Sequence, residues 1–151
     1  MATESLNPPI FSGRYDHALD NKNRITIPSR WRQTDSDEFF IMPDLTNSFL
    51  IVMPPAEFKS VGDQVSGNPA ISPQEKRTFI RHFYAMAQHC STDKQGRLLI
   101  PEEHCKQVAL NGEVVLAGTD KRFEIWNPQR WNAAAEAGKS TCEKVANVVG
   151  L

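Results

Sequence analysis

A nine-residue segment near the start of the chain is repeated in its second half. Asp20 to Pro28 (DNKNRITIP) returns as Asp93 to Pro101 (DKQGRLLIP), with aspartate, arginine, isoleucine and proline at identical offsets. Each copy is followed by an acidic-apolar run and then by a Phe-x-Ile segment (37–41 and 49–51, then 112–116 and 123–125). A repeat constrains the architecture more firmly than local propensity does. The chain is therefore a tandem duplication.

Length and composition indicate one globular body. The chain has 151 residues, so each copy supplies a unit near the lower size limit for a self-sufficient core, and we expect the halves to pack together. No apolar run approaches the ~20 residues needed to span a membrane, and the N-terminus (MATESLNPPI) has no secretory signal. We expect a cytoplasmic protein with no membrane partner.

The formal charge of −1 and the pI of about 6.4 lack the basic excess that nucleic-acid-binding proteins often show. This balance argues against DNA binding without excluding it. Phosphate contacts need only a local basic patch, and a symmetric assembly multiplies a small patch. The acidic residues also gather away from the repeated loops, at 35–38 and 102–103.

Three cysteines, Cys90, Cys105 and Cys142, cannot all pair, and a reducing compartment keeps them as thiols. His89-Cys90 and His104-Cys105 could be read as metal ligands. Neighbouring side chains on a strand point to opposite faces, however, so this spacing does not suit zinc, and a strand cysteine facing the core with a half-exposed helix-end pair is the preferred interpretation. We also find no nucleophile beside a placed base and no phosphate loop. We expect no metal, no cofactor, no small-molecule substrate and no enzymatic activity.

Each copy begins as strand, turn, strand and short helix. The β-branched run at 24–27 predicts a strand that stops at Pro28, and this proline suits the first turn of a short helix over 29–33. Pro101 has the same role before residues 102–105. Two further strands follow in each copy (38–42 with 49–53, then 113–117 with 122–126). A helix closes each unit, one from Pro54 and one from Asn127-Pro128 to about Gly138.

A further helix separates the copies. Ser72 and Glu75 form a capping box that opens a helix ending near Ala87. Its apolar stripe, which includes Phe79 and Phe83, is expected to pack between the repeats. The opposite face is basic (Lys76, Arg77 and Arg81). That face is interpreted as solvated surface, with a nucleic-acid contact as the alternative.

The repeated turn places an acid and an arginine four residues apart, as Asp20 with Arg24 and as Asp93 with Arg97. The residue before each arginine is Asn23 in one copy and Gly96 in the other. Asparagine and glycine accept positive φ most readily, so the pairing predicts a left-handed backbone there. Each aspartate can accept N–H groups of its turn and orient its arginine.

The same loops offer a DNA-binding set of side chains. Lys22 and Lys94 can neutralise phosphates, arginine can address guanine, and Asn21 or Gln95 can address adenine. The alternative is that aspartate and arginine only close each turn as a salt bridge. The residue types by themselves leave these two interpretations open.

These segments resemble the SpoVT/AbrB signature, and the chain from Phe11 to about Trp131 resembles the MraZ family, which carries two such domains in tandem. The match includes FSGRYDHALDNKNRITIPSRWR, STDKQGRLLIPEE and VVLAGTDKRFEIWNPQRW. The resemblance implies a DNA-binding transcriptional regulator of the division and cell-wall gene cluster that recognises direct repeats upstream of its own operon. It also implies a homo-oligomeric ring, commonly an octamer, associated with the nucleoid.

The expected fold is α+β, with two SpoVT/AbrB-like strand-turn-strand units intertwined as a pseudo-dimeric β core with peripheral helices. The expected domains are a disordered extension (1–11), unit one (12–60), a linker with a helix (61–88), unit two (89–133), and a helix end with a tail (134–151). The rival hypothesis is an antitoxin-like AbrB-fold module whose main partner is another protein. The weakly amphipathic tail from Lys139 to Leu151 could support that role.

Overall fold

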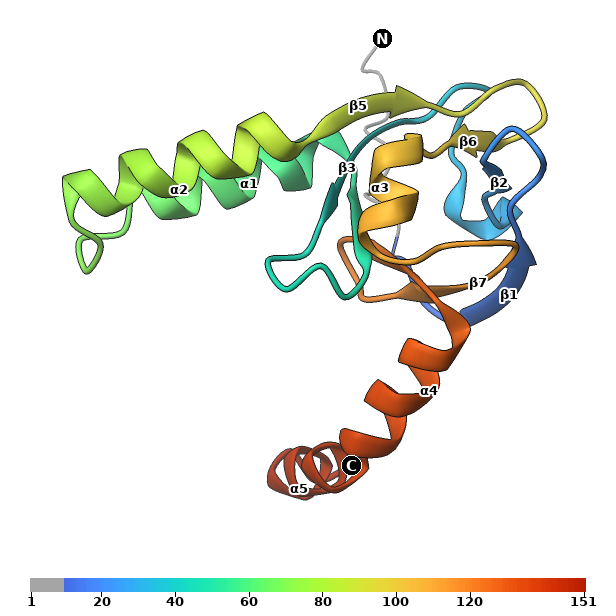
Figure 1. Cartoon of the computed structure of the whole chain (residues 1–151). Helices are drawn as coiled ribbons and strands as arrows, with labels where there is room; N and C mark the ends of the chain where they lie inside the picture. Colours follow the sequence, from blue (N-terminus) through green and yellow to red (C-terminus); the bar gives the residue numbers. More distant parts are fainter. Residues whose placement is uncertain (1–9) are drawn as a thin grey trace, which may run out of the picture.

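The computed structural model describes residues 10–151 and shows two similar successions of strands and helices (Figure 1). The elements of the first half are β1 (Arg14–Ala18), β2 (Arg24–Thr26), the 3-10 helix η1 (Ser29–Trp31), β3 (Glu38–Pro43), β4 (Leu50–Met53) and α1 (Pro55–Ser66). α2 (Pro73–Met86) then leads to β5 (Gln88–Ser91), β6 (Arg97–Leu99), α3 (Glu102–Gln107), β7 (Glu113–Gly118), β8 (Phe123–Trp126), α4 (Pro128–Ala137) and α5 (Lys139–Val148).

Strands of the two repeats are interleaved in one antiparallel sheet, ordered β1-β7-β8-β4-β3-β5. The first strand of each repeat pairs with the other repeat, β1 with β7 and β5 with β3. β4 and β8 join the halves at the centre. Exchanging the two repeats gives the same order read from the other end, so the sheet has approximate twofold symmetry. The predicted α+β fold with an intertwined pseudo-dimeric core is confirmed.

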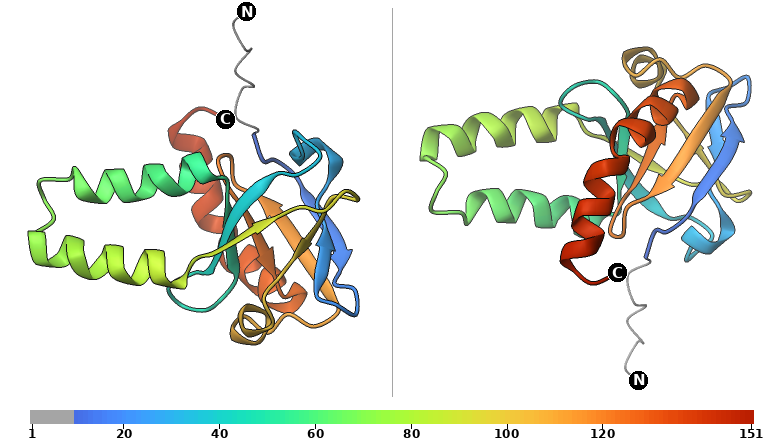
Figure 2. Two further views of the ribbon diagram at one scale, coloured as in Figure 1. Left: turned by 90° about the horizontal axis from the view of Figure 1, so that it is seen from above. Right: turned by 90° about the horizontal axis from the view of Figure 1, so that it is seen from below.

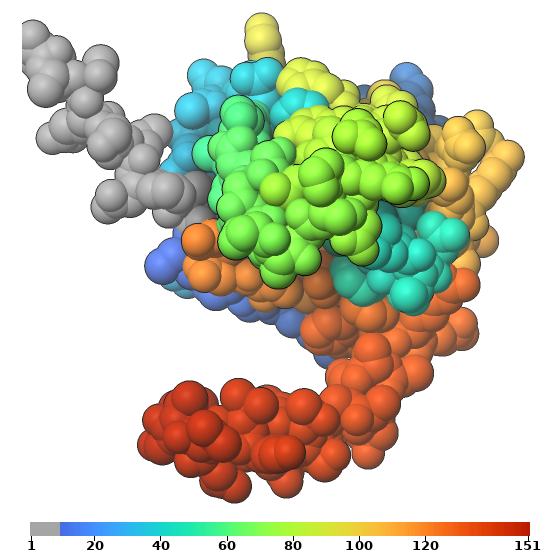
Figure 3. All heavy atoms as spheres, turned by 90° about the vertical axis from the view of Figure 1, so that its left-hand side faces the viewer, coloured from blue at the N-terminus to red at the C-terminus, as the bar shows by residue number. Residues whose placement is uncertain are grey.

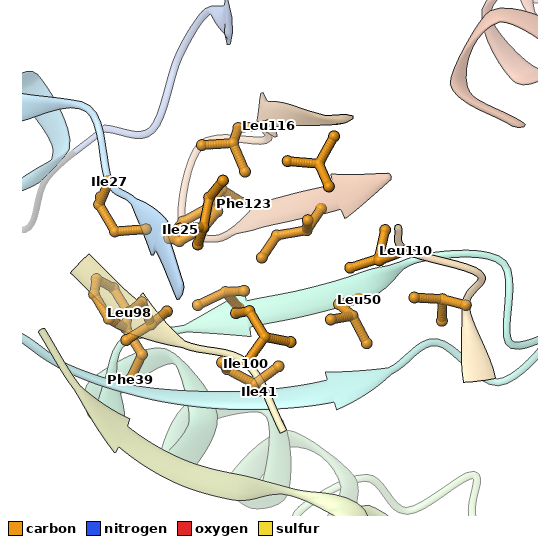
Figure 4. Packing of buried hydrophobic residues seen from close by; sticks show 14 of the residues in the cluster. Ile25, Ile27, Phe39, Ile41, Leu50, Leu98, Ile100, Leu110, Leu116 and Phe123 are labelled. Carbon is orange, nitrogen blue, oxygen red and sulfur yellow. The ribbon is translucent and has the colours of Figure 1, made fainter. Parts of the chain in front are cut away.

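The repeated segments meet as a second, two-stranded sheet of β2 and β6. Its inward side chains alternate along each strand, Ile25 with Ile27 and Leu98 with Ile100, and all four are at most 1% exposed. They enter one hydrophobic cluster with residues of β3, β4, β7 and β8 (Figure 4). Neither half could bury these side chains by itself, so the shared core binds the repeats into one body.

The helical hairpin of α1 and α2 extends away from the sheets (Figure 2). The capping box of Ser72 and Glu75 begins α2, as the sequence predicts. The expected packing of the α2 stripe between the repeats is wrong. Phe83 stacks on Phe58 of α1 at 5.0 Å, Phe58 stacks on Phe40 of β3 at 4.1 Å, and no residue of α2 is fully buried. Periodicity identified the apolar face of α2, whereas its main covering element is α1.

The chain beyond β8 forms two helices. Asn127 caps α4 by accepting hydrogen bonds from the N–H groups of Gln129 and Arg130, and Trp131 packs edge-on against Trp126 at 5.7 Å. Gly138 ends α4 as expected, and α5 follows directly. The tail from Lys139 is therefore helical, and α5 contains no buried residue.

Several element boundaries differ from expectation. Pro28 and Pro101 precede the short helices as N-caps, and η1 ends at Trp31 because only one 3-10 turn forms. The predicted disordered extension falls mostly on residues 1–9, which lie outside the described residues. Phe11, at its end, is buried against Trp31 with ring centroids 5.7 Å apart. Within residues 10–151, no helix has the length and apolarity needed to cross a membrane.

Candidate nucleic-acid interface

The two repeated loops flank the β2–β6 ribbon. Ile25 lies opposite Leu98 at its centre, with Arg24 opposite Leu99 and Thr26 opposite Arg97. Directly opposed residues of an antiparallel pair project to the same side, and alternate residues project to opposite sides. Because Ile25 and Leu98 face the core, the remaining four residues form one outward face: Arg24, Thr26, Arg97 and Leu99. The ribbon thus presents one arginine near each end.

Asp20 organises the first loop. Its Oδ1 accepts hydrogen bonds from the backbone N–H groups of Lys22 at 2.9 Å and Arg24 at 2.8 Å. Its Oδ2 accepts from Nε of Arg24 at 2.7 Å. One carboxylate therefore fixes both the turn and the direction of the arginine side chain.

Asp93 repeats this arrangement in the second loop. Its Oδ1 accepts from the N–H groups of Gln95 and Arg97, each at 2.9 Å, and its Oδ2 accepts from Nε of Arg97 at 2.8 Å. The second loop adds one contact, because Nη2 of Arg97 donates to Oε1 of Gln95 at 3.0 Å. Arg97 is held at two nitrogens, whereas Arg24 is held at one.

The backbone at Asn23 and Gly96 is left-handed, with φ of 60° and 77°. The carbonyl of Gly96 accepts a hydrogen bond from Ile27 N–H at 2.9 Å, and that of Asn23 accepts from Ile100 N–H at 2.8 Å. Each loop is thus anchored to the strand of the other repeat. The two turns are therefore linked through the β2–β6 ribbon.

The loop carboxylates are held in their charged form. The backbone N–H of Arg24 is the main cause of the lowered pKa of Asp20, and the backbone N–H of Arg97 has the same effect on the pKa of Asp93. Burial opposes both shifts, and the arginine side chains assist them. The aspartates therefore stay ionised and keep orienting the arginines at neutral pH.

The Asp–Arg salt bridge and a ligand-binding role are compatible. The carboxylate takes Nε of each arginine and leaves terminal guanidinium nitrogens available, and the side chains of Arg24 and Arg97 are 26% and 30% exposed. The two interpretations that the residue types left open, a DNA contact and a turn-closing salt bridge, are therefore not mutually exclusive. A guanidinium held by Nε is pre-oriented, so less rotamer freedom is lost on binding.

The four remaining loop residues are exposed, but the lysine and the amide occupy different offsets in the two loops. Lys22 and Gln95 both follow the aspartate by two residues, whereas Asn21 and Lys94 both follow it by one. The two loops therefore present lysine and amide groups in exchanged order. Within residues 10–151, neither lysine has an acidic side chain as an ion-pair partner.

Sequence reasoning missed Arg32, which follows η1 and lies over the second loop. A Cβ added at Gly96 would collide with the Arg32 guanidinium, with Cζ only 2.5 Å away. Nε of Arg32 is buried and has no hydrogen-bond partner among the described residues. At the matching offset after Pro101 stands Cys105, so the first loop lacks this cation. The only signal in the sequence is that glycine, rather than asparagine, precedes Arg97.

The histidine and cysteine pairs lie elsewhere. Burial raises the pKa of Cys90 to about 12, so its thiol stays protonated and is a poor nucleophile. His104 and Cys105 of α3 are both buried, which corrects the expected half-exposed pair. Cys105 packs in the hydrophobic core, so this side of the short helix α3 is covered. Over residues 10–151, no three histidine, cysteine or acidic residues converge as a metal site.

The fold and its paired loops define a tandem, intertwined protein of the SpoVT/AbrB type. A family model described as "MraZ protein, putative antitoxin-like" matches residues 10–81 and again 83–148. The chain belongs to the MraZ family.

Curated relatives support this assignment over nearly the whole chain. A protein of Carboxydothermus hydrogenoformans is 34% identical over 91% of this chain and 94% of its own length. One of Clostridium acetobutylicum is 37% identical over 81% and 84%, and one of Pediococcus pentosaceus is 36% identical over 91% and 94%. Each of the three is named Transcriptional regulator MraZ.

Proposed function

We propose that this protein is a sequence-specific DNA-binding transcriptional regulator that acts on direct repeats upstream of the division and cell-wall gene cluster. The names of its relatives support the regulatory role. The observation that carries the proposal is the pair of arginines braced through Nε on one outward ribbon. A two-stranded β-ribbon is one of the elements with which proteins read a DNA groove.

Each loop residue has a defined role in this proposal. Arg24 and Arg97 enter the major groove or grip its edge, where a guanidinium can address guanine O6 and N7. Lys22 and Lys94 contact phosphates, and Asn21 and Gln95 supply amide groups for adenine or the backbone. The remaining four residues set the loop shape: Asp20, Asp93, Asn23 and Gly96.

The proposed working form is a homo-oligomeric ring, an octamer, in the cytoplasm and associated with the nucleoid. One subunit offers only a few phosphate contacts, so several subunits must engage repeated sites at once to reach useful affinity. Once one subunit of an oligomer has bound DNA, the next subunit meets its site at a high local concentration. The proposal assigns the protein no catalytic role, no membrane partner and no small-molecule substrate.

The alternative function is a protein-interaction module of the antitoxin type. The exposed helix α5 favours it, since it has no buried residue and its side chains Val145 and Val148 are 55% and 79% exposed (Figure 3). Proteolytic removal of residues 139–151 distinguishes the two functions. If the shortened protein still binds DNA and loses no protein partner of the wild type, the interaction role of the tail is refuted. If the wild type has a protein partner that the shortened protein no longer binds, the alternative is supported.

Fluorescence anisotropy with DNA from upstream of the protein's own gene tests the proposed function. The wild-type protein is compared with Arg24→Ala and Arg97→Ala over a series from about 50 to 200 mM salt. We expect each substitution to weaken binding by about tenfold or more, because a bidentate base contact contributes ~1–3 kcal/mol.

Arg77→Ala is the matched control, since Arg77 is exposed on α2 away from the ribbon. A folded Arg97→Ala protein with full affinity for this DNA would refute the loop assignment. If the wild-type protein binds the upstream DNA no better than unrelated DNA, sequence-specific regulation at that site is refuted as well.

A further inference from the structure

An apolar groove lies between α2 and the loop that joins β3 to β4. Its volume is about 680 Å³, and its floor includes Met42, Phe79, Phe83 and Met86. Leu45 stands at its edge and is 86% exposed. Grooves of this size and composition are typical of binding sites rather than of ordinary protein surface.

A second exposed apolar surface lies on α5 and on its C-capping residue, Val149. Val145, Val148 and Val149 are 55%, 79% and 71% exposed. Their spacing of three and four residues places them on one side of the helix. An amphipathic helix with anchors at this spacing is the usual ligand of a hydrophobic groove. The chain therefore carries both an apolar groove and an apolar helix of the kind that binds such a groove.

The α5 helix does not fill the groove of its own chain. Figure 3 shows α5 in red, standing apart from the β3–β4 loop and from α2. α4 ends at Ala137 and α5 begins at Lys139, so Gly138 alone joins them. α4 is itself fixed to the sheet by the packing of Trp131 on Trp126. This connection has no slack that would let α5 fold back into the groove.

The two surfaces are complementary in charge. The groove is lined by two acidic residues, Asp44 and Glu75, and by no lysine or arginine among the described residues. The backbone N–H of Ser72 lowers the pKa of Glu75, which keeps this carboxylate ionised. α5 carries two lysines and one glutamate, and Lys144 lies one turn before Val148 on the same side. A basic apolar helix thus matches an acidic apolar groove.

We propose that α5 of one copy docks into the α2 groove of a second copy. Two different surfaces meet in this contact, so it is heterologous, and repeating it generates a closed ring or an open filament. The proposal rests on the proposed homo-oligomeric ring and identifies its interface. It also gives α5 a defined partner, the acidic apolar groove of a second copy, whereas the antitoxin-like alternative names no partner for this helix.

Two exposed substitutions test each side of the contact separately. Leu45→Asp places a charge at the edge of the groove, and Val145→Glu places one on the helix while retaining a good helix former. We expect either substitution to convert the oligomer to monomers, as measured by light scattering after size exclusion without DNA. Ile10→Glu is the control, because Ile10 is 71% exposed and lies on neither surface.

Mixing the two defective proteins identifies the type of contact. The Leu45→Asp copy keeps its helix and the Val145→Glu copy keeps its groove, so one intact contact forms between them. We expect a heterodimer of twice the chain mass and nothing larger. A symmetric contact of groove with groove, or helix with helix, would give no such recovery.

A charge comparison tests the acidic groove. Val145→Lys resembles Val145→Glu in having an unbranched side chain and a similar helix propensity but bears the opposite charge. We expect Val145→Lys to retain more oligomer at low salt and to lose this advantage as salt is raised. Equal dissociation of both variants would overturn the charge argument.

The remaining outcomes separate the interface from the ring. A wild-type oligomer whose mass is unchanged by Leu45→Asp and by Val145→Glu overturns this interface and leaves the ring intact. A wild-type protein that is monomeric at all concentrations overturns both. Neither result tests the assignment of Arg24 and Arg97 to DNA, because the mass is measured without DNA, although a monomeric wild type would remove the multivalent engagement proposed above.

Discussion

In each repeated loop an aspartate braces an arginine, Asp20 with Arg24 and Asp93 with Arg97. The two loops differ in what surrounds this Asp–Arg brace. In both, one aspartate binds two backbone N–H groups and Nε of an arginine with distances that agree within 0.1 Å. The second loop adds the Gln95 contact to Arg97 and lies under Arg32, whereas the first has neither. The duplication has therefore kept the device that aims the arginine and has varied the cations around it.

Because of this difference, we expect the two loops to tolerate amino-acid substitution unequally. Gly96 combines positive φ with close contact to Arg32, whereas Asn23 already carries a side chain at its left-handed position. The second loop is the more crowded and the more positive of the two. We expect it to be the more sensitive to backbone substitution and the stronger phosphate contact.

The largest expected effect comes from Gly96→Ala. The new Cβ collides with the Arg32 guanidinium and occupies a left-handed conformation, so we expect a loss of about 2 kcal/mol in unfolding free energy. The matched substitution Asn23→Gly should change it by less than about 1 kcal/mol. Urea denaturation measures both. Equal losses at the two positions would contradict the asymmetry.

The next effect comes from removing the brace charge. Asp20→Asn removes the charge and one of the two acceptor oxygens beside Arg24, whereas Asp93→Asn does the same beside Arg97 but leaves it the contact with Gln95. We expect Asp20→Asn to weaken DNA binding by about fivefold, or ~1 kcal/mol, and Asp93→Asn by less. Anisotropy titrations measure the two affinities. A larger loss for Asp93→Asn would show that Gln95 does not support the arginine.

Arg32→Ala should have a smaller effect that depends on salt. We propose that Arg32 adds one phosphate contact beside the second loop, so its removal should reduce the slope of log affinity against log salt by about one. Arg81→Ala on α2 is the control. An unchanged slope together with lower stability would assign Arg32 a packing role only.

Much of this fold could be predicted because the repeated segment, its helix caps and its turn residues are local features of the sequence. The capping box of Ser72 and the Asn127 cap mark helix starts from short-range chemistry, and their elements form where expected. The left-handed turns followed from the exchange of Asn23 for Gly96, since few residues accept that backbone.

The rest depends on contacts between distant segments. The stripe containing Phe79 shows that α2 has an apolar side but not that α1 covers it. Arg32 and Gly96 are far apart in the sequence, and no periodicity connects them. The helical state of α5 was also missed, because it starts at Gly138 without a side-chain cap.

The smallest expected effect is a pH dependence of stability that arises from the two braces. Native contacts lower the pKa values of Asp20 and Asp93, mainly through the N–H groups of Arg24 and Arg97. Each brace therefore stabilises the native state fully above the unfolded-state pKa near 4, and this contribution is lost as pH falls through the native pKa. Urea midpoints of the wild type and of the Asp20→Asn/Asp93→Asn double variant should stay apart above about pH 4 and converge as the pH falls below it. Both carboxylates are solvent-accessible, so the convergence should be slight. A gap that stays constant would mean that these charges do not stabilise the loops, and the braces would then act on DNA affinity alone.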